Sequence, residues 1–538
     1  MASITLRQAL GVLAKSSPFA VCTPAEASRR DSFDDLKEYL FIEQQIERDF
    51  QNLLESASDG EVIFLCGSSG DGKSEILTRH ARRFGAKCRF HLDATHSFAP
   101  SQSGIQALDE LFDKQTDDKR PLVIGINVGM LANYAKEGAK RHAEICAAIE
   151  LFLDNRHGTT SYHFLDFEKY PKFYFNNHGE ACSDFAKELM RRLTLNSPSN
   201  PFYALALRDA ERGGEKRLLA NFHLLALPTV QDTIIINLLK IRLARDQFIT
   251  TRALLDFLHH LLTGDGYISD NLFRGIDNEL VTRTSNFDPA TKRTQKLDQF
   301  ILRYELQLPD PALEDFLLEL EKNSIYFPKN EIKLGQAGSL VRLFYLLRNE
   351  NLGNGYHQQF AAEFVDPLLE KYAKTWYLHQ NYNDEVKQKT QLRQFYVNEL
   401  INAIYLYANR NAPNLEKGEL FIGEFGSVQL AVPVELKVDY ARIKNQNNGA
   451  ASLFYAYLRV SENTLQPIPV NYNLFELVRK LNAGYRPNRY DKSAIVMLDE
   501  IVEQISEIAK LSQKLRFYDN GHEYSAILDD EIISISGV

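Results

Sequence analysis

The feature that most constrains the fold of this chain is a glycine-rich stretch in residues 61–80, which read EVIFLCGSSGDGKSEILTRH. A short apolar run, Val62–Cys66, opens it with the residue types of a buried β-strand. From Lys73 onward the apolar residues have helical spacing. The loop between them matches the pattern G-x-x-x-x-G-K-S/T without a substitution, at Gly67, Gly72, Lys73 and Ser74. The sequence therefore predicts a strand, a phosphate-binding loop and a helix in direct succession.

The residue types of this loop suit the binding of a nucleotide. Glycines let successive backbone N–H groups curl around a phosphate, and the helix N-terminus adds a partial positive charge. Lys73 can reach the β- and γ-phosphates, and Ser74 can ligate Mg²⁺. A chance glycine-rich turn would lack the strand before it and the helix after it, so we expect ATP and Mg²⁺ here. The predicted nucleotide contacts are Gly67, Ser68, Ser69, Gly70, Asp71, Gly72, Lys73 and Ser74.

The composition limits the classes of protein to which the chain can belong. Its 538 residues exceed what one hydrophobic core organises, so we expect about two to four domains. Charged residues make up 25% and hydrophobic residues 44%, as in ordinary globular proteins. The formal net charge of -9 leaves no basic surplus for holding DNA. Any nucleic-acid contact must therefore be local or supplied by a partner.

The cysteines and the first residues indicate a compartment. The five cysteines are scattered without a C-x-x-C pair, which favours reduced thiols and argues against a zinc site. The opening residues, MASITLRQALGVLAKSS, lack the apolar core of a signal peptide. No run of about 18 apolar residues occurs, so the sequence predicts no membrane span. We expect a cytoplasmic protein.

Strand and helix patterns alternate as far as about residue 200. Residues 122–128, LVIGINV, form a continuous apolar run typical of a strand buried on both faces, and residues 162–167, YHFLDF, form another. Such alternation behind a phosphate-binding loop predicts a parallel sheet with right-handed crossovers. We therefore expect an α/β P-loop NTPase core in residues 61–200, preceded by a helical segment in residues 1–60.

The pattern changes twice more along the chain. Residues 201–265 have helical spacing and predict a lid over the nucleotide, and residues 266–390 predict a mostly helical middle domain. Residues 391–538 mix strand-like with helical segments, and Asp519-Asn520-Gly521 predicts a hairpin turn between two of the strands. We expect a separate C-terminal α+β domain there.

Three segments carry a resemblance to a known family. They read SSPFAV near the start, then SFDDLKEYLFIEQQIERDF, then FLCGSSGDGKSEILTRH across the loop. Together they resemble the DptF component of bacterial DNA-phosphorothioation-dependent restriction systems, most clearly over the N-terminal half. The resemblance implies an ATPase-like subunit in a complex with other proteins, which restricts DNA lacking the host's phosphorothioate marks and meets that DNA through the complex.

The order of the elements also permits roles by analogy with AAA-type ATPases. Asn127, at the tip of a predicted buried strand, holds the place of the residue that orients the attacking water; an asparagine capping the next helix is the alternative. Arg156 holds the place of an arginine finger, which would reach a neighbouring subunit and require a homo-oligomer. Arg252, at the start of a lid helix, holds the place of a second sensor. A solvated surface arginine is the alternative for both.

Three sets of residues compete for the role of the acid that holds Mg²⁺. Asp109 and Glu110 form the dipeptide typical of this role, but their neighbours have helical spacing, which favours a solvated helix face. Asp93 ends a strand-like run and is a candidate metal ligand. Asp166, followed by Glu168, ends another such run. If no acid is in place, the alternative is a structural adaptor that binds ATP without turnover.

Two stretches of the C-terminal region carry further patterns. Glu435 and Lys437, with Glu424 upstream, are similar to the E-x-K core of restriction-type nucleases, in which carboxylates bind Mg²⁺. An ordinary amphipathic strand with both side chains on its solvent face explains them better.

Residues 479–492, RKLNAGYRPNRYDK, interleave basic residues with tyrosines and are the best local candidate for a phosphate-backbone contact. An ATP-gated nuclease is therefore a third hypothesis.

Overall fold

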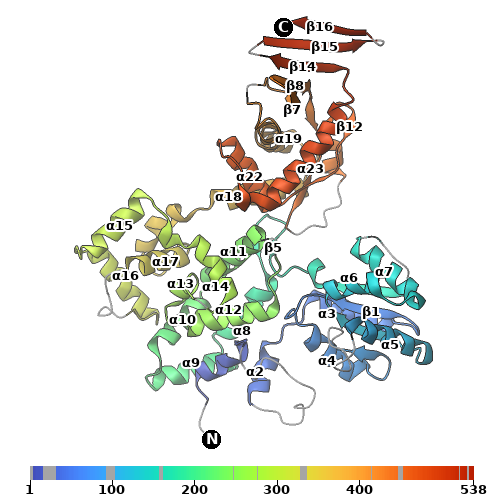
Figure 1. The fold of residues 1–538 in the computed structure, drawn as a ribbon. Coiled ribbons are helices and arrows are strands. Elements are labelled where there is room, and N and C mark those ends of the chain that lie inside the picture. The colour runs from blue at the N-terminus through green and yellow to red at the C-terminus, as the bar shows by residue number, and fades with distance from the viewer. Residues whose placement is uncertain are drawn as a thin grey trace. The chain divides into compact units, whose positions relative to one another are not determined.

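The chain forms two compact units in a computed structural model (Figure 1). The first consists of Met1–Phe173, Cys182–Arg242 and Gln247–Val365, and the second of Tyr174–Ala181, Leu243–Asp246 and Asp366–Val538. The structure describes residues 4–15, 32–92, 103–154, 156, 161–245, 247–275, 277–327, 336–413, 415–445, 452–519, 522–529 and 532–537.

A parallel sheet of four strands forms the α/β core of the first unit. Its strands are β1 (Val62–Cys66), β2 (Arg89–His91), β3 (Leu122–Ile126) and β4 (Tyr162–Asp166). They lie in the order β2-β3-β1-β4. Because β1 pairs in parallel with β3 on one side and with β4 on the other, its carboxyl end is flanked by two other carboxyl ends. The strand that leads into the glycine-rich loop is therefore central.

Helices cover both faces of this sheet, as Figure 1 shows on either side of β1. They are α3 (Gln45–Ser56), α4 (Lys73–Phe84), α5 (Gly104–Asp117), α6 (Val128–Glu137) and α7 (Ala143–Leu153). Val62, Phe64 and Cys66 pack with α5, α6 and α7. Ile63 and Leu65, which point to the opposite face, pack with α3 and α4. The alternation along β1 produces two cores, and a strand buried on both faces has the continuous apolar sequence seen here.

Helices form the rest of the first unit. They are α1 (Leu6–Leu10), η1 (Gly11–Leu13), α2 (Ser32–Leu40), α8 (Asp184–Thr194), α9 (Pro201–Glu211), α10 (Lys216–Ala226), α11 (Pro228–Arg245), α12 (Thr251–Thr263), α13 (Ile268–Asn271), α14 (Glu279–Thr284), α15 (Gln295–Glu305), α16 (Pro311–Lys322), α17 (Ala337–Leu347) and η9 (Tyr356–Phe364). Among the described residues no single helix has the length and apolar character needed to cross a membrane, and only α10 and α11 taken together, bent by 83°, reach them.

Apart from Leu243–Asp246, the predicted lid lies in the same unit as the part of the predicted middle domain up to residue 365. The side chain of Asn221, in the lid segment, accepts a hydrogen bond from the N–H of Ile268 at 2.7 Å. The Asn278 amide donates to Asp256 of the lid segment at 2.8 Å. These partly or fully buried hydrogen bonds join helices that the sequence pattern had separated at residue 265.

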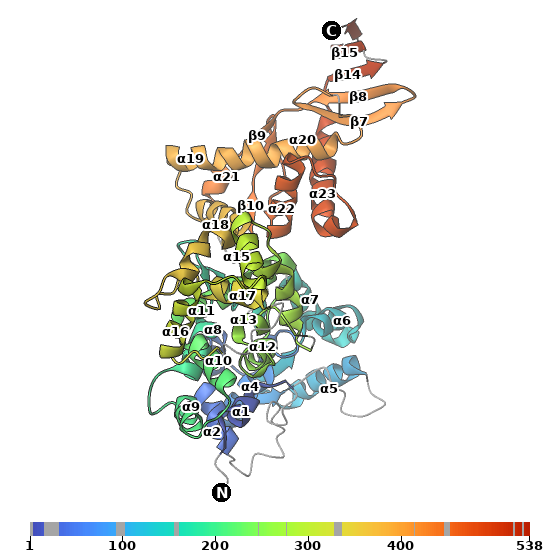
Figure 2. The ribbon, with the colours of Figure 1, turned by 90° about the vertical axis from the view of Figure 1, so that its left-hand side faces the viewer.

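The second unit contains the predicted α+β domain, and its long continuous part, Asp366–Val538, begins with helices. These are α18 (Pro367–Gln380), α19 (Val386–Arg393), the π-helix η10 (Gln394–Ile401), α20 (Asn402–Ala408), α21 (Tyr440–Lys444), α22 (Tyr472–Asn482), η11 (Arg489–Asp491) and α23 (Lys492–Ala509). Figure 2 shows α22 and α23 side by side. The unit starts before the predicted boundary at residue 391 because the buried Tyr372 of α18 donates to the carbonyls of Ser452 and Val470, at 2.6 and 3.2 Å. A helix with these contacts packs with the strands that follow it.

The largest sheet of the second unit is antiparallel. Its strands are β7 (Glu419–Phe425), β8 (Val428–Pro433), β14 (Lys514–Asp519), β15 (His522–Asp529) and β16 (Ile532–Gly537), in the order β16-β15-β14-β8-β7. Smaller sheets contain β5 (Tyr174–Phe175), β6 (Ala181–Cys182), β9 (Leu436–Val438), β10 (Phe454–Ala456), β11 (Leu458–Val460), β12 (Asn463–Thr464) and β13 (Ile468–Val470). Asp519 pairs with His522, so β14 and β15 flank the predicted turn, whose residues 520 and 521 lie outside the described part.

Candidate nucleotide-binding site

The glycine-rich loop has the backbone that the motif requires. It leaves β1 at Gly67 and enters α4 at Lys73, as the sequence predicts. Gly70 and Gly72 have φ values of 90° and 103°, a left-handed conformation that side chains with a Cβ rarely adopt. Gly72 is the N-cap of α4, so the loop ends directly at the positive end of the helix.

The side chains that we expect to bind phosphate lie across the loop or are exposed at its surface. The Nζ atom of Lys73 donates to the carbonyl oxygens of Gly67 and Ser68, each at 2.7 Å, and so lies across the loop. Ser68, Ser69 and Ser74 are exposed. The first N–H groups of any α-helix have no acceptor within the helix, and here they belong to the residues that follow the loop. The arrangement combines a cation, a hydroxyl group and backbone donors at one place.

Gly67 is required by a close approach as well as by the motif. A Cβ atom at this position would lie 2.8 Å from the ring of Phe167 and 3.0 Å from the Asp71 carboxylate. Phe167 follows β4 directly, so the start of the loop packs against the end of the neighbouring strand. Only a residue without a side chain fits between them.

Asp71 differs from the other predicted nucleotide contacts because its side chain points into the protein. The residue is 5% exposed. One carboxylate oxygen accepts the N–H of Ser68 at 2.6 Å, and the other lies 4.0 Å from the Nζ atom of Lys172. The Asp71 side chain therefore holds the backbone of the loop at Ser68 from the protein interior. Sequence reasoning missed Lys172, because nothing in the pattern of residues after β4 marks a buried lysine.

Asp166 is the acidic candidate that the structure brings to the loop. It ends β4 and pairs with Cys66, the last residue of β1. Its carboxyl group accepts the N–H of Glu168 at 3.0 Å, and burial raises its pKa, with a smaller contribution from Asp71. The Cys66 thiol lies in the field of both Asp166 and Lys73, and burial raises its pKa. The acid and the loop lysine thus lie at the same end of the central strand.

Asp109 and Glu110 lie on α5 and do not end a strand. The Asp109 carboxylate accepts hydrogen bonds from the Tyr134 hydroxyl at 2.8 Å and from the N–H of Ala139 at 3.1 Å. Burial and the hydrogen bond to Asp109 raise the pKa of the Tyr134 hydroxyl. Glu110 is exposed. The observed helix agrees with the helical spacing of their neighbours and not with the strand end that the D-E dipeptide predicts. The hydrogen bond from Tyr134 to Asp109 connects α6 to α5. Asp93 lies outside the described residues.

Asn127 follows β3 and is the N-cap of α6. Its side-chain oxygen accepts the N–H of Met130 at 2.6 Å. This is the capping contact that the alternative interpretation expected. Ile126, the residue before it, pairs with Cys66, so Asn127 also lies beside the start of the loop. A role in orienting water stays a prediction.

The two predicted arginines have different surroundings. Arg156 is exposed after α7, and its guanidinium lies 3.9 Å from Asp154, so a role as a finger stays a prediction. Arg252 is the exposed second residue of α12, and its backbone N–H donates to the carbonyl of Gly70 at 3.0 Å. The hydroxyl of Thr251 donates to the carbonyl of Asp71, also at 3.0 Å. The N-terminus of α12 therefore contacts the loop directly.

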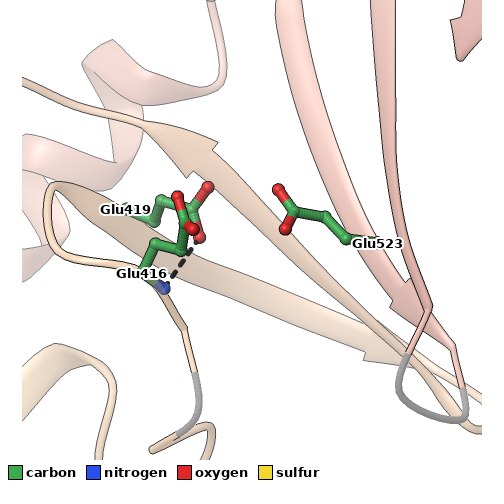
Figure 3. A group of neighbouring side chains, drawn as sticks. All are labelled: Glu416, Glu419 and Glu523. Atoms are coloured by element: carbon green, nitrogen blue, oxygen red, sulfur yellow. Dashed lines mark hydrogen bonds between the residues drawn. The ribbon is translucent and has the colours of Figure 1, made fainter. Parts of the chain in front are cut away.

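The nuclease-like pattern of the second unit does not assemble an acidic site. Glu435 and Lys437 are exposed and form an ion pair with each other at 2.7 Å. Within the described residues, the acids close enough to share a cation are Glu416, Glu419 and Glu523 (Figure 3), none of which the sequence pattern had singled out.

One guanidinium contacts all three acids of this cluster. Arg516 lies 3.2 Å from Glu416 and 3.1 Å from Glu419, and it also binds Glu523. The Tyr518 hydroxyl donates to Glu419. The cluster is therefore an ion-pair network on one face of the antiparallel sheet.

The basic stretch of residues 479–492 is partly used within the protein. Arg479 binds Glu399 at 3.1 Å, and Lys480 binds Glu476 at 3.0 Å. The Tyr485 hydroxyl donates to Asp491 at 2.8 Å. These contacts leave Arg486, Arg489 and Lys492 as the basic residues of the stretch on which a nucleic-acid contact would depend.

Comparisons with models of protein families, with curated proteins and with solved structures found no match to this chain.

Proposed function

We propose that this chain binds ATP with Mg²⁺ at residues 67–74 and hydrolyses it. The observation that carries the proposal is the loop itself, in which two left-handed glycines connect a central parallel strand to a helix N-terminus. Backbone N–H groups and a helix dipole at this place favour a phosphate. The Lys73 ammonium adds a positive charge that can contact the β- and γ-phosphates of a nucleoside triphosphate.

The residues around the loop supply what phosphoryl transfer requires. Ser74, the second residue of α4, offers a hydroxyl ligand for Mg²⁺. A bound Mg²⁺ neutralises charge on the phosphates. Asp166, at the end of β4, is the acid best placed to hold a metal-bound water. Arg156 would act on the site of a neighbouring subunit, so turnover would then require an oligomer.

The test compares two lysines. Lys73→Ala should weaken binding of a fluorescent ATP analogue about tenfold or more, because the loop loses its cation. Lys136→Ala is the control, because Lys136 is an exposed lysine on α6. Equal affinity of the two variants for the analogue would contradict ATP binding at the loop.

A second function, stable nucleotide binding without turnover, is favoured by the contacts of two predicted catalytic residues. Asp109 and Asn127 both use their side-chain oxygens for structural hydrogen bonds. Hydrolysis would then depend on Asp166. Phosphate release that is absent from the wild type at every protein concentration, with and without DNA, would favour this adaptor over an ATPase.

The resemblance in the N-terminal half supports the wider role. We propose a cytoplasmic subunit of a complex that restricts DNA lacking phosphorothioate marks, in which partner proteins contact and cut the DNA. In cells that carry the complete system, Lys73→Ala should abolish restriction of unmodified plasmid while Lys136→Ala retains it. Full restriction by Lys73→Ala would contradict a requirement for nucleotide binding in this role.

A further inference from the structure

Lys172 is a buried lysine directly below the glycine-rich loop. Its side chain is 6% exposed, and the rings of Phe167 and Phe185 lie 5.5 and 5.9 Å from its Nζ atom. Burial lowers its pKa, and the nearby Asp71 opposes that change. A lysine in such surroundings costs free energy unless its charge is compensated.

Asp71 is the acid that faces this lysine. Its carboxylate lies 4.0 Å from the Lys172 ammonium, in a place where both side chains are almost without solvent. The other carboxylate oxygen accepts the N–H of Ser68. Asp71 therefore connects Lys172 to the first turn of the loop.

The cost of breaking a buried ion pair depends on how it is broken. Removal of one partner leaves an uncompensated charge and is strongly unfavourable, whereas replacement of both by neutral groups of similar shape is often nearly neutral. If Lys172 were lost, the buried Asp71 carboxylate would have no cation beside it, so its turning toward solvent would lower the free energy. That movement would break the hydrogen bond that it accepts from the N–H of Ser68.

We propose that Lys172 is a positioning residue that holds the glycine-rich loop in its phosphate-binding shape through Asp71. Lys172 acts on the loop and does not contact the nucleotide. This inference rests on the proposed function for its effect on ATP, but the effect on the loop itself does not depend on ATP.

The experiment is a double-mutant cycle with two readouts. Lys172→Met and Asp71→Asn each leave one buried charge, while the double variant leaves none, and the asparagine oxygen can still accept the Ser68 N–H. Each single variant should have a lower Tm without nucleotide and an affinity for MgATP that is about tenfold weaker or more. The double variant should recover both, with an affinity within about threefold of the wild type. Lys187→Met is the control, because Lys187 forms an exposed pair with Asp232.

The outcomes separate the two proposals. A double variant as weak in ATP binding as Lys172→Met alone would overturn the positioning role and would mean that Lys172 acts on the nucleotide directly. Additive losses of Tm would overturn it too. If the wild type binds no MgATP but the Tm of the double variant recovers, the proposed function fails while the coupling of Lys172 to the loop stands.

Discussion

The two sheets of this protein, the parallel sheet of the first unit and the antiparallel sheet of the second, are covered in different ways. On β1 of the parallel sheet, Phe64 packs with α5, α6 and α7, and Ile63 with α3 and α4. On one face of the antiparallel sheet, which we call its polar face, Arg516 forms ion pairs with acids. On the opposite face, Leu515 pairs with Ala526 and Phe517 pairs with Tyr524.

This difference decides where chemistry can occur. When helices cover both faces of a parallel sheet, its carboxyl edge is the place where loops from several strands meet, and ligands commonly bind there. The antiparallel sheet instead leaves apolar residues in solvent at its edge strand, where Ile533 and Ile535 are 66% and 64% exposed. In Figures 1 and 2, β14, β15 and β16 extend beyond the described helices of the second unit. The first sheet thus has a candidate site at its edge, and the second has an ion-pair network on one face.

The largest expected effect compares a phenylalanine from each sheet. Phe64 is buried and stacks on Phe164 with ring centroids 4.8 Å apart, whereas Phe425 is 83% exposed. Phe64→Ala should lower the free energy of unfolding by about 3–5 kcal/mol. Phe425→Ala should change it by less than about 0.5 kcal/mol. Urea unfolding of both variants measures the difference, and equal losses would contradict the contrast between the sheets.

The next effect tests whether ion pairs hold the polar face of the second sheet. Arg516→Met leaves Glu416, Glu419 and Glu523 together without their cation. We expect a loss of about 2–3 kcal/mol, below that of a fully buried pair because Arg516 is partly exposed. Arg83→Met, which removes an exposed pair with Glu55, should cost less than about 1 kcal/mol. A stability of Arg516→Met equal to that of the control would mean that the cluster contributes nothing.

A smaller effect concerns the close packing at the carboxyl edge of the parallel sheet. Gly67→Ala would place a Cβ atom 2.8 Å from Phe167, and we expect a loss of about 1–3 kcal/mol together with weaker binding of ATP. Gly11→Ala is the matched control, because a Cβ there meets nothing within 4 Å. Thermal unfolding with and without MgATP checks both parts. A Gly67→Ala variant that is stabilised by MgATP as much as the wild type would show that the loop tolerates a side chain.

The smallest effect on stability has the opposite sign. Burial raises the pKa of Asp166 in the folded protein, so ionisation of this carboxyl group destabilises the fold at neutral pH. Asp166→Asn should therefore raise the Tm slightly at pH 7. The gain should shrink as the pH falls below the folded pKa of Asp166 and vanish below the lower pKa of this carboxyl group in the unfolded chain, where both states are neutral. Phosphate release should fall about a hundredfold or more if Asp166 is the catalytic acid. Unchanged phosphate release would remove Asp166 from the mechanism.

The sequence predicts those elements whose structure depends on residues close together along the chain. The loop, its strand and its helix follow from a local pattern, and so do β14 and β15 on either side of the Asp519-Asn520-Gly521 turn. The helical period around Asp109 likewise predicts α5, whereas the D-E dipeptide predicts a strand end that the structure does not have at this position.

The remaining parts depend on contacts between distant segments. Asp166 gains its place only when β4 pairs with β1, and Lys172 is buried only when the end of β4 packs below the loop. The start of the second unit before residue 391 depends on Tyr372 reaching two carbonyls of later segments. No period or motif in a single segment carries this information.

The most direct test of nucleotide binding at the parallel sheet is hydrogen exchange of the wild-type chain with and without MgATP. The account predicts slower exchange of the backbone N–H groups in residues 67–76, where the loop and the first turn of α4 would donate to phosphates. Exchange in β14, β15 and β16 should not change. Unchanged exchange in residues 67–76 at saturating MgATP, or protection confined to the second unit, would contradict the central claim.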